Sequence, residues 1–492
     1  MSLINVTNLT FAYEGSYDNI FENVSLQIDT DWKLGFIGRN GRGKTTFLKL
    51  LQNKFEYQGS IETNVSFDYF PYEIKDTTAM TMDILQQINS EFEIWQLKRE
   101  ISLLALSEDL LYQPFETLSG GEQVKMLLAV LFLKQNYFLL IDEPTNHLDA
   151  EARAVVSCYL QSKKGFILVS HDKTFLDCCT NHVLVINKTN IEIQKGNFSS
   201  WWANKEKQDV FEQGEHAKLL KEVKQLSSAA KRTSGWSVKT EKSKNQRTSA
   251  GLRPDKGFVS HKAAKLMKRA KSLEQRNEKL LSQKSKLLLN IESNEELKIH
   301  PLPYAHTNLA EFKNFSLFYG NKQICNPLNF YIQKGDRIAL CGPNGSGKST
   351  LLNFVRNQVI DYKGYYQIGK DLILSYVSQD TTHLQGNLSH FVEHYQLDEP
   401  LLKSILRKMD FPREQFHKSV THYSEGQKKK LLLAKSLSEK AHLYLWDEPL
   451  NYIDIFSRIQ IQDLILKYCP TIIFVEHDEA FHDKIATKKI YF

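Results

Sequence analysis

Four short motifs occur twice in this chain, in one order and at nearly one spacing. The first pair is the glycine-rich stretch Gly38–Thr45 and its counterpart Gly342–Ser349, which lies 304 residues later. The other pairs, at offsets of 305, 305 and 306, are Leu118–Gln123 with Tyr423–Gln427, Asp142–Pro144 with Asp447–Pro449, and Ser170–Asp172 with Glu476–Asp478. Because a repeat at one period marks a duplicated structural unit, the chain is predicted to hold two homologous domains.

Each glycine-rich motif follows an apolar run that predicts a buried strand, at Lys33–Ile37 and at Arg337–Cys341. A strand, a glycine-rich loop and a helix in succession are the context that a P-loop requires. Two further apolar runs, Phe138–Ile141 and Leu443–Trp446, are typical of buried parallel strands. The sequence therefore predicts an α/β fold with two tandem P-loop domains.

The segment between the repeats has the pattern of two helices that pack along a seam. Positions recur at alternating steps of four and three residues, at Leu219, Val223, Leu226 and Ala230, and again at Leu266, Ala270, Leu273, Asn277, Leu280, Lys284, Leu287 and Ile291. Such heptads predict a helical hairpin, and Gly235, Gly251, Pro254 and Gly257 lie where we expect it to turn. The expected boundaries are 1–202 for the first P-loop domain, 203–300 for the α-helical linker and 301–492 for the second P-loop domain.

The linker also carries the excess positive charge. The whole chain has a formal net charge of +6, whereas Lys205–Lys298 has 23 basic and 12 acidic residues, a net of +11. The expected tip of the hairpin, Lys231–Arg276, has 14 basic and 3 acidic residues. A narrow basic rod suits a nucleic acid, since Lys and Arg neutralise phosphates and release counterions. The competing interpretation is a solvated coiled coil without a nucleic-acid partner.

The rest of the composition argues against a membrane protein. No apolar run approaches the ~18–20 residues that a membrane-spanning helix needs. The chain begins without the basic and then apolar pattern of a signal peptide, and its six cysteines lack metal-ligand spacing. We therefore expect a cytoplasmic protein with reduced thiols and no stable membrane partner.

The two P-loops predict binding of ATP with Mg²⁺. Backbone N–H groups in the glycine-rich turns can close on phosphate oxygens, and the N-terminus of the following helix adds positive potential. Lys44 and Lys348 are expected at the β- and γ-phosphates, and the hydroxyls of Thr45 and Ser349 at Mg²⁺. The P-loop residues assigned to ATP are Gly38, Asn40, Gly41, Gly43, Lys44, Thr45 and Thr46, and Gly342, Asn344, Gly345, Gly347, Lys348, Ser349 and Thr350.

Two acidic residues in succession end an apolar run in each domain. The first of them, Asp142 or Asp447, can orient the coordination shell of Mg²⁺. The second, Glu143 or Glu448, can position and deprotonate the attacking water. The alternative for these glutamates is a surface acid that only forms salt bridges.

A histidine follows another apolar run in each domain, at His171 and at His477. A single histidine in such a place is usually structural. Because it recurs at the same place in both repeats, we interpret each one as a sensor of the γ-phosphate and include it in the catalytic group.

In this order, the motifs resemble those of ATP-binding-cassette proteins, and the resemblance covers both repeats. In that family Leu118–Gln123 is the signature motif, which contacts the γ-phosphate of the nucleotide held by the other cassette. The resemblance implies that ATP brings the two cassettes face to face within one monomer. The first ATP site, called site one, would combine Lys44 of the first cassette with Ser424 and Gly426 of the second. The second ATP site, called site two, would combine Lys348 with Ser119 and Gly121 of the first cassette.

The resemblance also extends to residues around the P-loops. Tyr13 and Tyr319 are similar to the family's adenine-stacking aromatics, although core aromatics remain the alternative. Gln379 corresponds to the glutamine that contacts Mg²⁺ and water, whereas Tyr72 stands at that place in the first cassette. Glu425 replaces a signature glycine, so its side chain is expected to point away from the phosphate. We therefore expect the two sites to be unequal.

A narrower resemblance links Glu143–Asp149 to the F subfamily of the cassette proteins, which are tandem and act on ribosomes. Met1–Leu50 and Tyr423–Lys430 are most similar to the Lsa-type antibiotic resistance factors. This resemblance implies binding to the exit-tRNA site of the large ribosomal subunit, next to rRNA and peptidyl-tRNA. It also implies relief of inhibition by lincosamides, streptogramin A compounds and pleuromutilins. The expected ribosome-contacting tip residues are Trp236, Lys244, Arg247 and Phe258.

Other classes of protein remain open at this point. A housekeeping translation factor of the same subfamily would regulate elongation without conferring resistance. The ATPase subunit of an exporter is disfavoured by the basic linker. A DNA-repair cassette ATPase would need a far longer coiled coil, and a ribosome-recycling cassette protein would need cysteines before Cys158 for an iron–sulfur domain.

Overall fold

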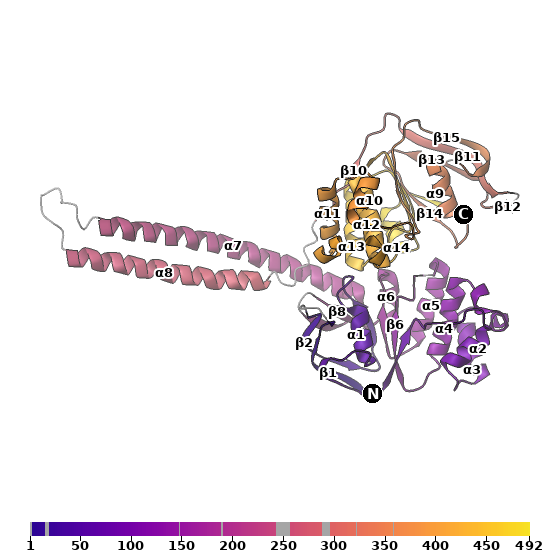
Figure 1. The fold of residues 1–492 in the computed structure, drawn as a ribbon, viewed down its shortest axis with the longest axis horizontal. Coiled ribbons are helices and arrows are strands. Elements are labelled where there is room, and N and C mark those ends of the chain that lie inside the picture. Colours follow the sequence, from indigo (N-terminus) through magenta and orange to yellow (C-terminus); the bar gives the residue numbers. More distant parts are fainter. Residues whose placement is uncertain are drawn as a thin grey trace. The chain divides into compact units, whose positions relative to one another are not determined.

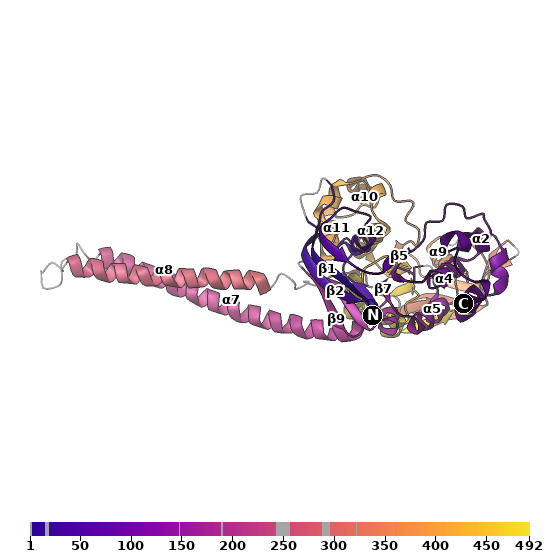
Figure 2. The ribbon, with the colours of Figure 1, turned by 90° about the horizontal axis from the view of Figure 1, so that it is seen from below.

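The computed structural model describes residues 2–14, 19–146, 148–187, 190–242, 256–287, 296–320, 322–357 and 359–492. The chain divides into two compact units. One unit contains Met1–Ser199 and Asn294–Phe492 and therefore both P-loop domains, and the other contains Ser200–Ser293. The ribbon views show strands wrapped by helices in the first unit and two long helices in the second (Figure 1, Figure 2).

The first cassette is built on a six-stranded sheet of order β5-β6-β7-β3-β8-β9, in which only β9 runs antiparallel to its neighbour. Its strands are β3 (Lys33–Ile37), β5 (Ser66–Phe70), β6 (Tyr137–Asp142), β7 (Phe166–Val169), β8 (His182–Ile186) and β9 (Ile191–Lys195). An antiparallel sheet of order β2-β1-β4 contains β1 (Leu3–Phe11), β2 (Phe21–Asp29) and β4 (Gln58–Glu62). The helices are α1 (Lys44–Leu51), α2 (Thr81–Ile88), α3 (Ile94–Leu103), α4 (Gly120–Leu131), α5 (Ala150–Ser162) and α6 (Lys173–Cys179), with short turns η1 (Glu108–Tyr112) and η2 (Phe115–Thr117).

The second cassette repeats this plan with a five-stranded parallel sheet of order β16-β18-β19-β14-β20. Its strands are β14 (Arg337–Cys341), β16 (Leu374–Val377), β18 (Leu443–Asp447), β19 (Ile472–Val475) and β20 (Lys488–Tyr491). The antiparallel strands are β11 (Asn308–Tyr319), β12 (Lys322–Gln323), β13 (Leu328–Gln333) and β15 (Asp361–Ile368), and β10 (His300–Pro301) pairs with β17 (Lys440–Ala441). The helices are α9 (Lys348–Asn357), α10 (Leu388–His394), α11 (Glu399–Lys408), α12 (Glu425–Ser438), α13 (Ile455–Tyr468) and α14 (Glu479–Ile485), with turns η4 (Arg413–His417) and η5 (Val420–His422).

Strand β14 shows why these parallel strands are almost wholly apolar. Ala339 belongs to the core cluster that includes α12, whereas its neighbours Ile338 and Leu340 belong to the cluster that includes α9. Successive side chains of a strand point to opposite faces, so both faces of β14 are covered. All three residues are fully buried. This two-sided burial fixes the end of the strand from which the second P-loop starts.

The second unit consists of α7 (Phe198–Lys242) and α8 (Lys256–Leu287). The heptad positions Ala230 and Ala270 are buried, and Leu226, Leu266 and Leu273 are half-buried. The seam continues beyond the apolar part through small polar residues, because Thr233 and Ser237 are also buried. Ser237 Oγ donates a hydrogen bond of 3.0 Å to the carbonyl oxygen of Ala263, which joins the two helices.

The expectation that the chain turns at Gly235 and Gly257 was wrong. Both glycines lie inside helices, because α7 continues to Lys242 and α8 begins at Lys256. A glycine inside a helix costs only about 1 kcal/mol relative to alanine, and packing along the seam outweighs that cost. Gly251, Pro254 and Ile291 lie outside the described residues. Across the described ranges, no helix combines the length and the apolarity that would let it span a membrane.

Two glycines should respond in opposite ways to replacement by alanine. Gly364 in β15 has a φ of 104°, and an added Cβ would overlap the carbonyl oxygen of Asn314. Gly235 is helical, and an added Cβ would meet no atom within 4 Å. We expect Gly364→Ala to destabilise its cassette by about 2 kcal/mol or more, and Gly235→Ala to strengthen α7 by about 1 kcal/mol. Thermal unfolding followed by circular dichroism tests both, and equal shifts for the two variants would contradict the assignment.

Candidate nucleotide sites

Three neighbouring parallel strands of each cassette bring the sequence motifs to one edge of the sheet. In the first cassette β7 lies between β6 and β3, and Val169 pairs with both Asp142 and Phe36. The P-loop follows β3, Asp142 ends β6, and His171 follows β7. The carboxyl ends of parallel strands are the usual ligand site of such sheets, so the motifs gather where a ligand can bind.

The P-loop lysines lie inside the loops that precede them. Lys44 Nζ donates to the carbonyl oxygens of Gly38 at 2.7 Å and Arg39 at 3.2 Å. Lys348 Nζ donates in the same way to Gly342 at 2.9 Å and Pro343 at 2.7 Å. Burial lowers the pKa of both ammonium groups from their usual value. Each lysine is thus a cation at the bottom of a glycine-rich turn, which suits a phosphate.

The last glycine before each P-loop lysine has no room for a side chain. Gly43 has a φ of 94°, and an added Cβ would come within 2.6 Å of Ile20 Cγ2. Gly347 has a φ of 98°, and its Cβ would overlap the side chain of Ile324. Glycine is therefore needed at both places to start α1 and α9 with their N–H groups open to a ligand.

The hydroxyl and carboxylate expected at Mg²⁺ face each other in both cassettes. Thr45 Oγ1 donates to Asp142 Oδ2 at 2.9 Å, and Ser349 Oγ donates to Asp447 Oδ1 at 3.1 Å. Burial raises the pKa of both carboxyl groups, that of Asp447 to about 6, although the hydroxyl bonds oppose the shift. Oxygen ligands of this kind are those that Mg²⁺ takes together with substrate phosphates, so the residues fit the ion.

The glutamates that follow these aspartates have an uncommon backbone conformation. Glu143 has a φ of 52° and Glu448 a φ of 45°, and non-glycine residues in this region are often found at functional sites. His477 Nε2 lies 3.4 Å from Glu448 Oε1 in hydrogen-bond geometry, and Asn451 Nδ2 donates to Glu448 Oε2 at 2.6 Å. His171 Nε2 lies 3.2 Å from Glu143 Oε1, but among the residues that the structure describes no side chain donates a hydrogen bond to either carboxylate oxygen of Glu143.

This difference in hydrogen bonding separates the two glutamates electrostatically. Burial, together with the charge of Asp142, raises the pKa of Glu143 to about 8. Burial also acts to raise the pKa of Glu448, but the hydrogen bond with His477 and the charges of His477, Lys429 and Lys348 together outweigh it, so that the pKa of Glu448 is lowered. Burial and the charge of Lys44 hold the pKa of His171 well below its usual value, which favours a neutral imidazole.

Each signature motif begins a helix with its serine as the N-cap. Ser119 caps α4 in a capping box, where its backbone N–H donates to Glu122 Oε2 at 2.8 Å. Ser424 caps α12 in the same way with Gln427, at 3.0 Å. The capping boxes fix the first turn of both helices, whose N–H groups carry positive potential.

Glu425, which stands where the signature has a glycine, is held by its own cassette. Thr381 Oγ1 donates to Glu425 Oε2 at 2.5 Å, and Lys428 Nζ lies 2.9 Å from Oε1. The ammonium group of Lys428 therefore balances the charge of the Glu425 carboxylate, although Glu425 still lines the cavity of site one.

Each P-loop lies in a cavity that combines residues of both cassettes. The cavity of site one has a volume of about 490 Å³ and that of site two about 600 Å³. Site one is lined by Tyr13, Asn40, Gly41, Gly43, Lys44, Thr45, Thr46, Asp142, Glu143 and His171 together with Ser424, Glu425, Gly426 and Tyr452. Site two is lined by Tyr319, Asn344, Gly345, Gly347, Lys348, Ser349, Thr350, Gln379, Glu448 and His477 together with Gly120, Asn146 and Leu148. Ser119 and Gly121 flank Gly120, and Gly38 and Gly342 follow the strands behind the two P-loops.

The two tyrosines expected to stack on adenine are both solvent-exposed. Tyr13 is 43% exposed and Tyr319 is 63% exposed. Tyr13 also forms a 2.8 Å hydrogen bond with Thr46 through its hydroxyl and packs edge-on against Phe11. Exposed rings in the lining of the two cavities suit a stacking role better than a role in the core.

Besides Asn451 and Tyr452, the structure adds a tyrosine that sequence reasoning did not single out. Tyr69, next to the last residue of β5, donates from its hydroxyl to Asp142 Oδ2 at 3.0 Å. Tyr72, which stands at the glutamine position, instead donates to Asp68. Tyr376 occupies the place of Tyr69 in the second cassette, where charge on Asp447 helps burial to raise its pKa to about 12. The sequence pattern that could have identified Tyr69 is a tyrosine at the penultimate position of both β5 and β16.

The expected tip residues are only partly described. Trp236 lies in α7 and is 59% exposed. Phe258 lies in α8, but its side chain is outside the described residues, as are Lys244 and Arg247 as a whole.

The chain matches known proteins along nearly its whole length. The sequence pattern of the family described as "ABC transporter" matches residues 21–146 and 325–451. The chain is similar to "Ribosome protection protein VmlR" of Bacillus subtilis (strain 168), with 27% identity over 99% of this chain and 86% of the relative. It is also similar to "Erythromycin resistance ATP-binding protein MsrA" of Staphylococcus epidermidis, with 28% identity over 93% of this chain and 91% of the relative.

The name of a third relative describes a different role. "Energy-dependent translational throttle protein EttA" of Haemophilus influenzae (strain ATCC 51907 / DSM 11121 / KW20 / Rd) is 25% identical over 95% of this chain and 88% of the relative. Among solved structures, an archaeal ribosome recycling factor aABCE1 in complex with stalk protein aP1 has a TM-score of 0.63 at 17% identity, over 98% of this chain and 87% of that one. At this identity the likeness shows the tandem fold alone.

The bond from Tyr69 to Asp142 gives a test of unequal sites. We expect Tyr69→Phe to lower ATP hydrolysis at site one by about tenfold, since a hydrogen bond to a charged group is worth about 1.5–3 kcal/mol. The measurement is ATPase rate in a Lys348→Ala background, which leaves site one as the active site. The matched control is Tyr376→Phe in a Lys44→Ala background. The hydroxyl that donates to Asp447 belongs to Ser349 and not to Tyr376, so this substitution should leave the hydrogen bond to the aspartate in place. An equal loss in both arms would contradict the assignment.

Proposed function

Because this chain belongs to the ATP-binding-cassette family, as a tandem ATPase of the F subfamily, we propose that it is an ATP-dependent ribosome protection factor. The observation that carries the proposal is a long, exposed and basic pair of helices between two nucleotide-binding cassettes. Support comes from two similar proteins, one named as a ribosome protection protein and the other as an erythromycin resistance protein. The proposed domain boundaries are 1–202, 203–300 and 301–492, and the proposed location is the cytoplasm, on ribosomes.

The cassettes supply the energy for the cycle. ATP supplies the phosphoanhydride bond that is hydrolysed, and Mg²⁺ supplies positive charge that balances the phosphates. Lys44 and Lys348 bind the phosphates, and the signature serines close each site from the opposite cassette. Glu143 and Glu448 orient the attacking water. The neighbouring His171 and His477 contact the γ-phosphate when it is present. Hydrolysis removes that phosphate and with it the contacts that hold the cassettes together.

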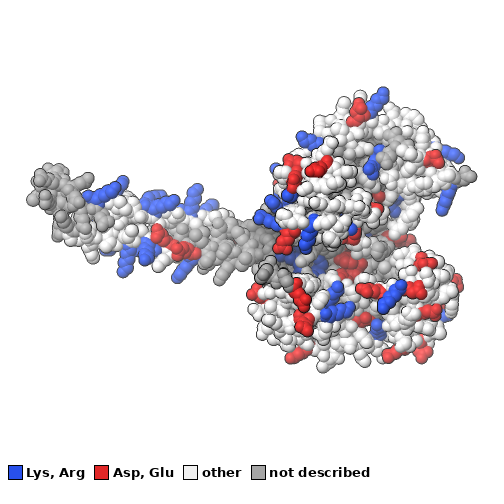
Figure 3. Space-filling model, in the orientation of Figure 1, with Lys and Arg blue, Asp and Glu red and all other residues white. Residues whose placement is uncertain are grey.

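The helical unit supplies the contact with RNA. On α8 the basic residues Lys262, Lys265, Lys268, Arg269 and Lys271 are all exposed. Figure 3 shows Lys and Arg side chains along the visible face of this unit. Phosphate contacts of this kind bind RNA without reading its sequence. The exposed ring of Trp236 adds a surface on which an unpaired base can stack.

The proposed site of action is the exit-tRNA site of the bacterial large ribosomal subunit. The helical unit enters that site, displaces the peptidyl-tRNA and disturbs the neighbouring drug pocket. The proposed drugs are lincosamides, streptogramin A compounds and pleuromutilins. Minimum inhibitory concentrations with and without expression of the chain test this spectrum.

A second candidate function is a translation factor that regulates elongation, which the similarity to the throttle protein EttA favours. The two candidates differ in one result. Resistance requires the inhibitory concentration of at least one of the three drug classes to rise on expression. Unchanged concentrations, together with altered elongation in an extract free of drug, would select the translation factor.

The first prediction for this function concerns release from the ribosome. We expect Glu143→Gln/Glu448→Gln to lower ATP hydrolysis by about 100-fold or more, because general base catalysis contributes that much. ATP would then keep the cassettes closed and the chain on the ribosome. Cosedimentation with ribosomes in ATP should rise several-fold over the unsubstituted chain. Equal pelleting of the two proteins would refute the cycle.

The second prediction concerns the basic face of α8. We expect Lys265→Glu/Lys268→Glu to weaken ribosome binding and to reduce its logarithmic salt dependence by about 1.5, since each lost phosphate contact removes about 0.7–0.9. The matched control, Lys75→Glu/Lys370→Glu, changes the net charge equally on exposed lysines of the two cassettes. ATPase activity without ribosomes should stay unchanged in both variants. If both weakened binding equally, the linker would have no special role.

A further inference from the structure

We propose that Arg39, Arg42 and Asp410 form a charged latch that keeps site one closed longer than site two. Site one would then retain its nucleotide while site two opens and exchanges. Asp410 is a positioning residue in this scheme, because it acts on the first P-loop rather than on the nucleotide. The proposal concerns the ATPase by itself and does not depend on the ribosomal role.

The latch joins the P-loop of the first cassette to the second cassette. Arg42 Nη2 donates a hydrogen bond of 3.0 Å to Asp410 Oδ2, and Arg39 Nε lies 3.9 Å from the same oxygen. Between these arginines, Asn40 Nδ2 donates to the carbonyl oxygen of Tyr452 at 2.7 Å. The glycine-rich turn that receives the phosphates of site one is therefore attached directly to the opposite cassette.

Burial makes these contacts stronger than an ordinary surface ion pair. The side chain of Arg39 is 4% exposed, and its guanidinium carbon lies 5.4 Å from the ring centre of Phe456. The side chains of Arg42 and Asp410 are 21% and 37% exposed. Charge-assisted hydrogen bonds gain strength when water is partly excluded, whereas fully exposed pairs contribute little.

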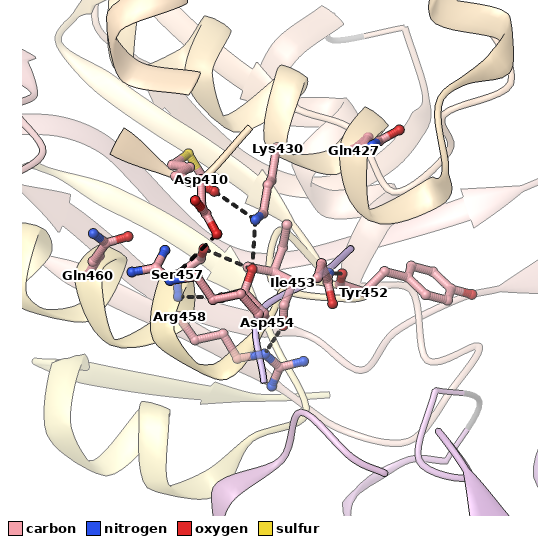
Figure 4. A network of polar contacts seen from close by, with 12 residues as sticks. Asp410, Gln427, Lys430, Tyr452, Ile453, Asp454, Ser457, Arg458 and Gln460 are labelled. Carbon is pink, nitrogen blue, oxygen red and sulfur yellow. Dashed lines mark hydrogen bonds and ion pairs between the residues drawn. The ribbon is translucent and has the colours of Figure 1, made fainter. Parts of the chain in front are cut away.

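The turn that carries Asp410 is anchored from within its own cassette. Buried Lys430 donates from Nζ to the carbonyl oxygen of Met409 at 2.7 Å and to Asp454 Oδ2 at 2.6 Å. Asp454 in turn accepts from the backbone N–H of Ser457 at 2.9 Å, at the start of α13. Figure 4 shows Lys430 directed at Asp454, with Asp410 beside it. Opening site one must therefore break the latch, because this turn is held in place.

The second cassette interface has the same backbone turn without the charges. Asp410 has a φ of 58°, and its counterpart Ala105 has a φ of 52° in a turn with the same hydrogen bonds. Pro343 and Ser346 take the places of the two arginines, and Glu151 takes the place of Phe456. None of these residues can form the ion pair or the cation–π contact. A cavity of about 470 Å³, lined in part by Pro343 and Glu151, lies there instead.

The test measures release of nucleotide from each site. The chain is loaded with a fluorescent ATP analogue and Mg²⁺, and release is followed after excess unlabelled ATP is added. Lys44→Ala and Lys348→Ala assign the phases to site one and site two. We expect two phases in the unsubstituted chain, with the slow phase absent in Lys44→Ala. Asp410→Asn should speed the slow phase by about fivefold or more, since it removes the negative charge that strengthens the bond from Arg42, and leave the fast phase unchanged.

The matched control is Asp371→Asn, at an exposed aspartate of the second cassette that has a similar φ of 57°. Asparagine tolerates this left-handed conformation, so neither substitution should strain the backbone of its turn, and both variants should fold. Raising the salt concentration should speed the slow phase in the unsubstituted chain more than in Asp410→Asn, because the latch is charged. One release rate for both sites, a slow phase that survives in Lys44→Ala, or equal changes of both phases in Asp410→Asn would overturn the proposal.

Discussion

The order of three parallel strands is the constraint on which both nucleotide sites depend. Backbone hydrogen bonds place β7 between β6 and β3, so the P-loop, the magnesium aspartate and the histidine meet at one edge. The same order, β18-β19-β14, recurs in the second cassette. Because helices cover both faces, the strands cannot slide without exposing apolar side chains. The site geometry is therefore fixed by the core rather than by the loops that form it.

The common scaffold supports two unequal sites. Glu448 is held by His477 and Asn451, whereas no side chain in the described part of the chain donates a hydrogen bond to the carboxylate of Glu143. Tyr69 binds Asp142 in the first cassette, next to the Thr45 hydroxyl bond. These differences lie in side chains only, since both glutamates share the same left-handed backbone. Duplication preserved the scaffold, and substitution changed the chemistry of each copy.

The contacts between the two cassettes add a further difference between site one and site two. An added Cβ on Gly426 would come within 2.6 Å of the Tyr452 carbonyl and 3.0 Å of Asn40 Nδ2, so signature and P-loop approach closely at site one. The arginines beside Asn40 add a charged attachment, whereas uncharged Pro343 and Ser346 stand at these two positions of the second P-loop. Two sites with unequal interfaces can open in a defined order.

The sequence by itself determined the duplication, the two P-loops, the tandem α/β fold and the basic helical pair. These follow from local patterns, because glycine spacing, apolar runs and heptads are set by backbone geometry and burial. It did not locate the helix ends near Gly235 and Gly257, since packing along the seam overrides a weak local preference. Tertiary structure alone decided that Tyr69 reaches Asp142 and that Arg42 reaches Asp410, residues 73 and 368 positions apart. Such contacts depend on which strands and domains become neighbours in the folded chain, and local sequence patterns do not predict those neighbours.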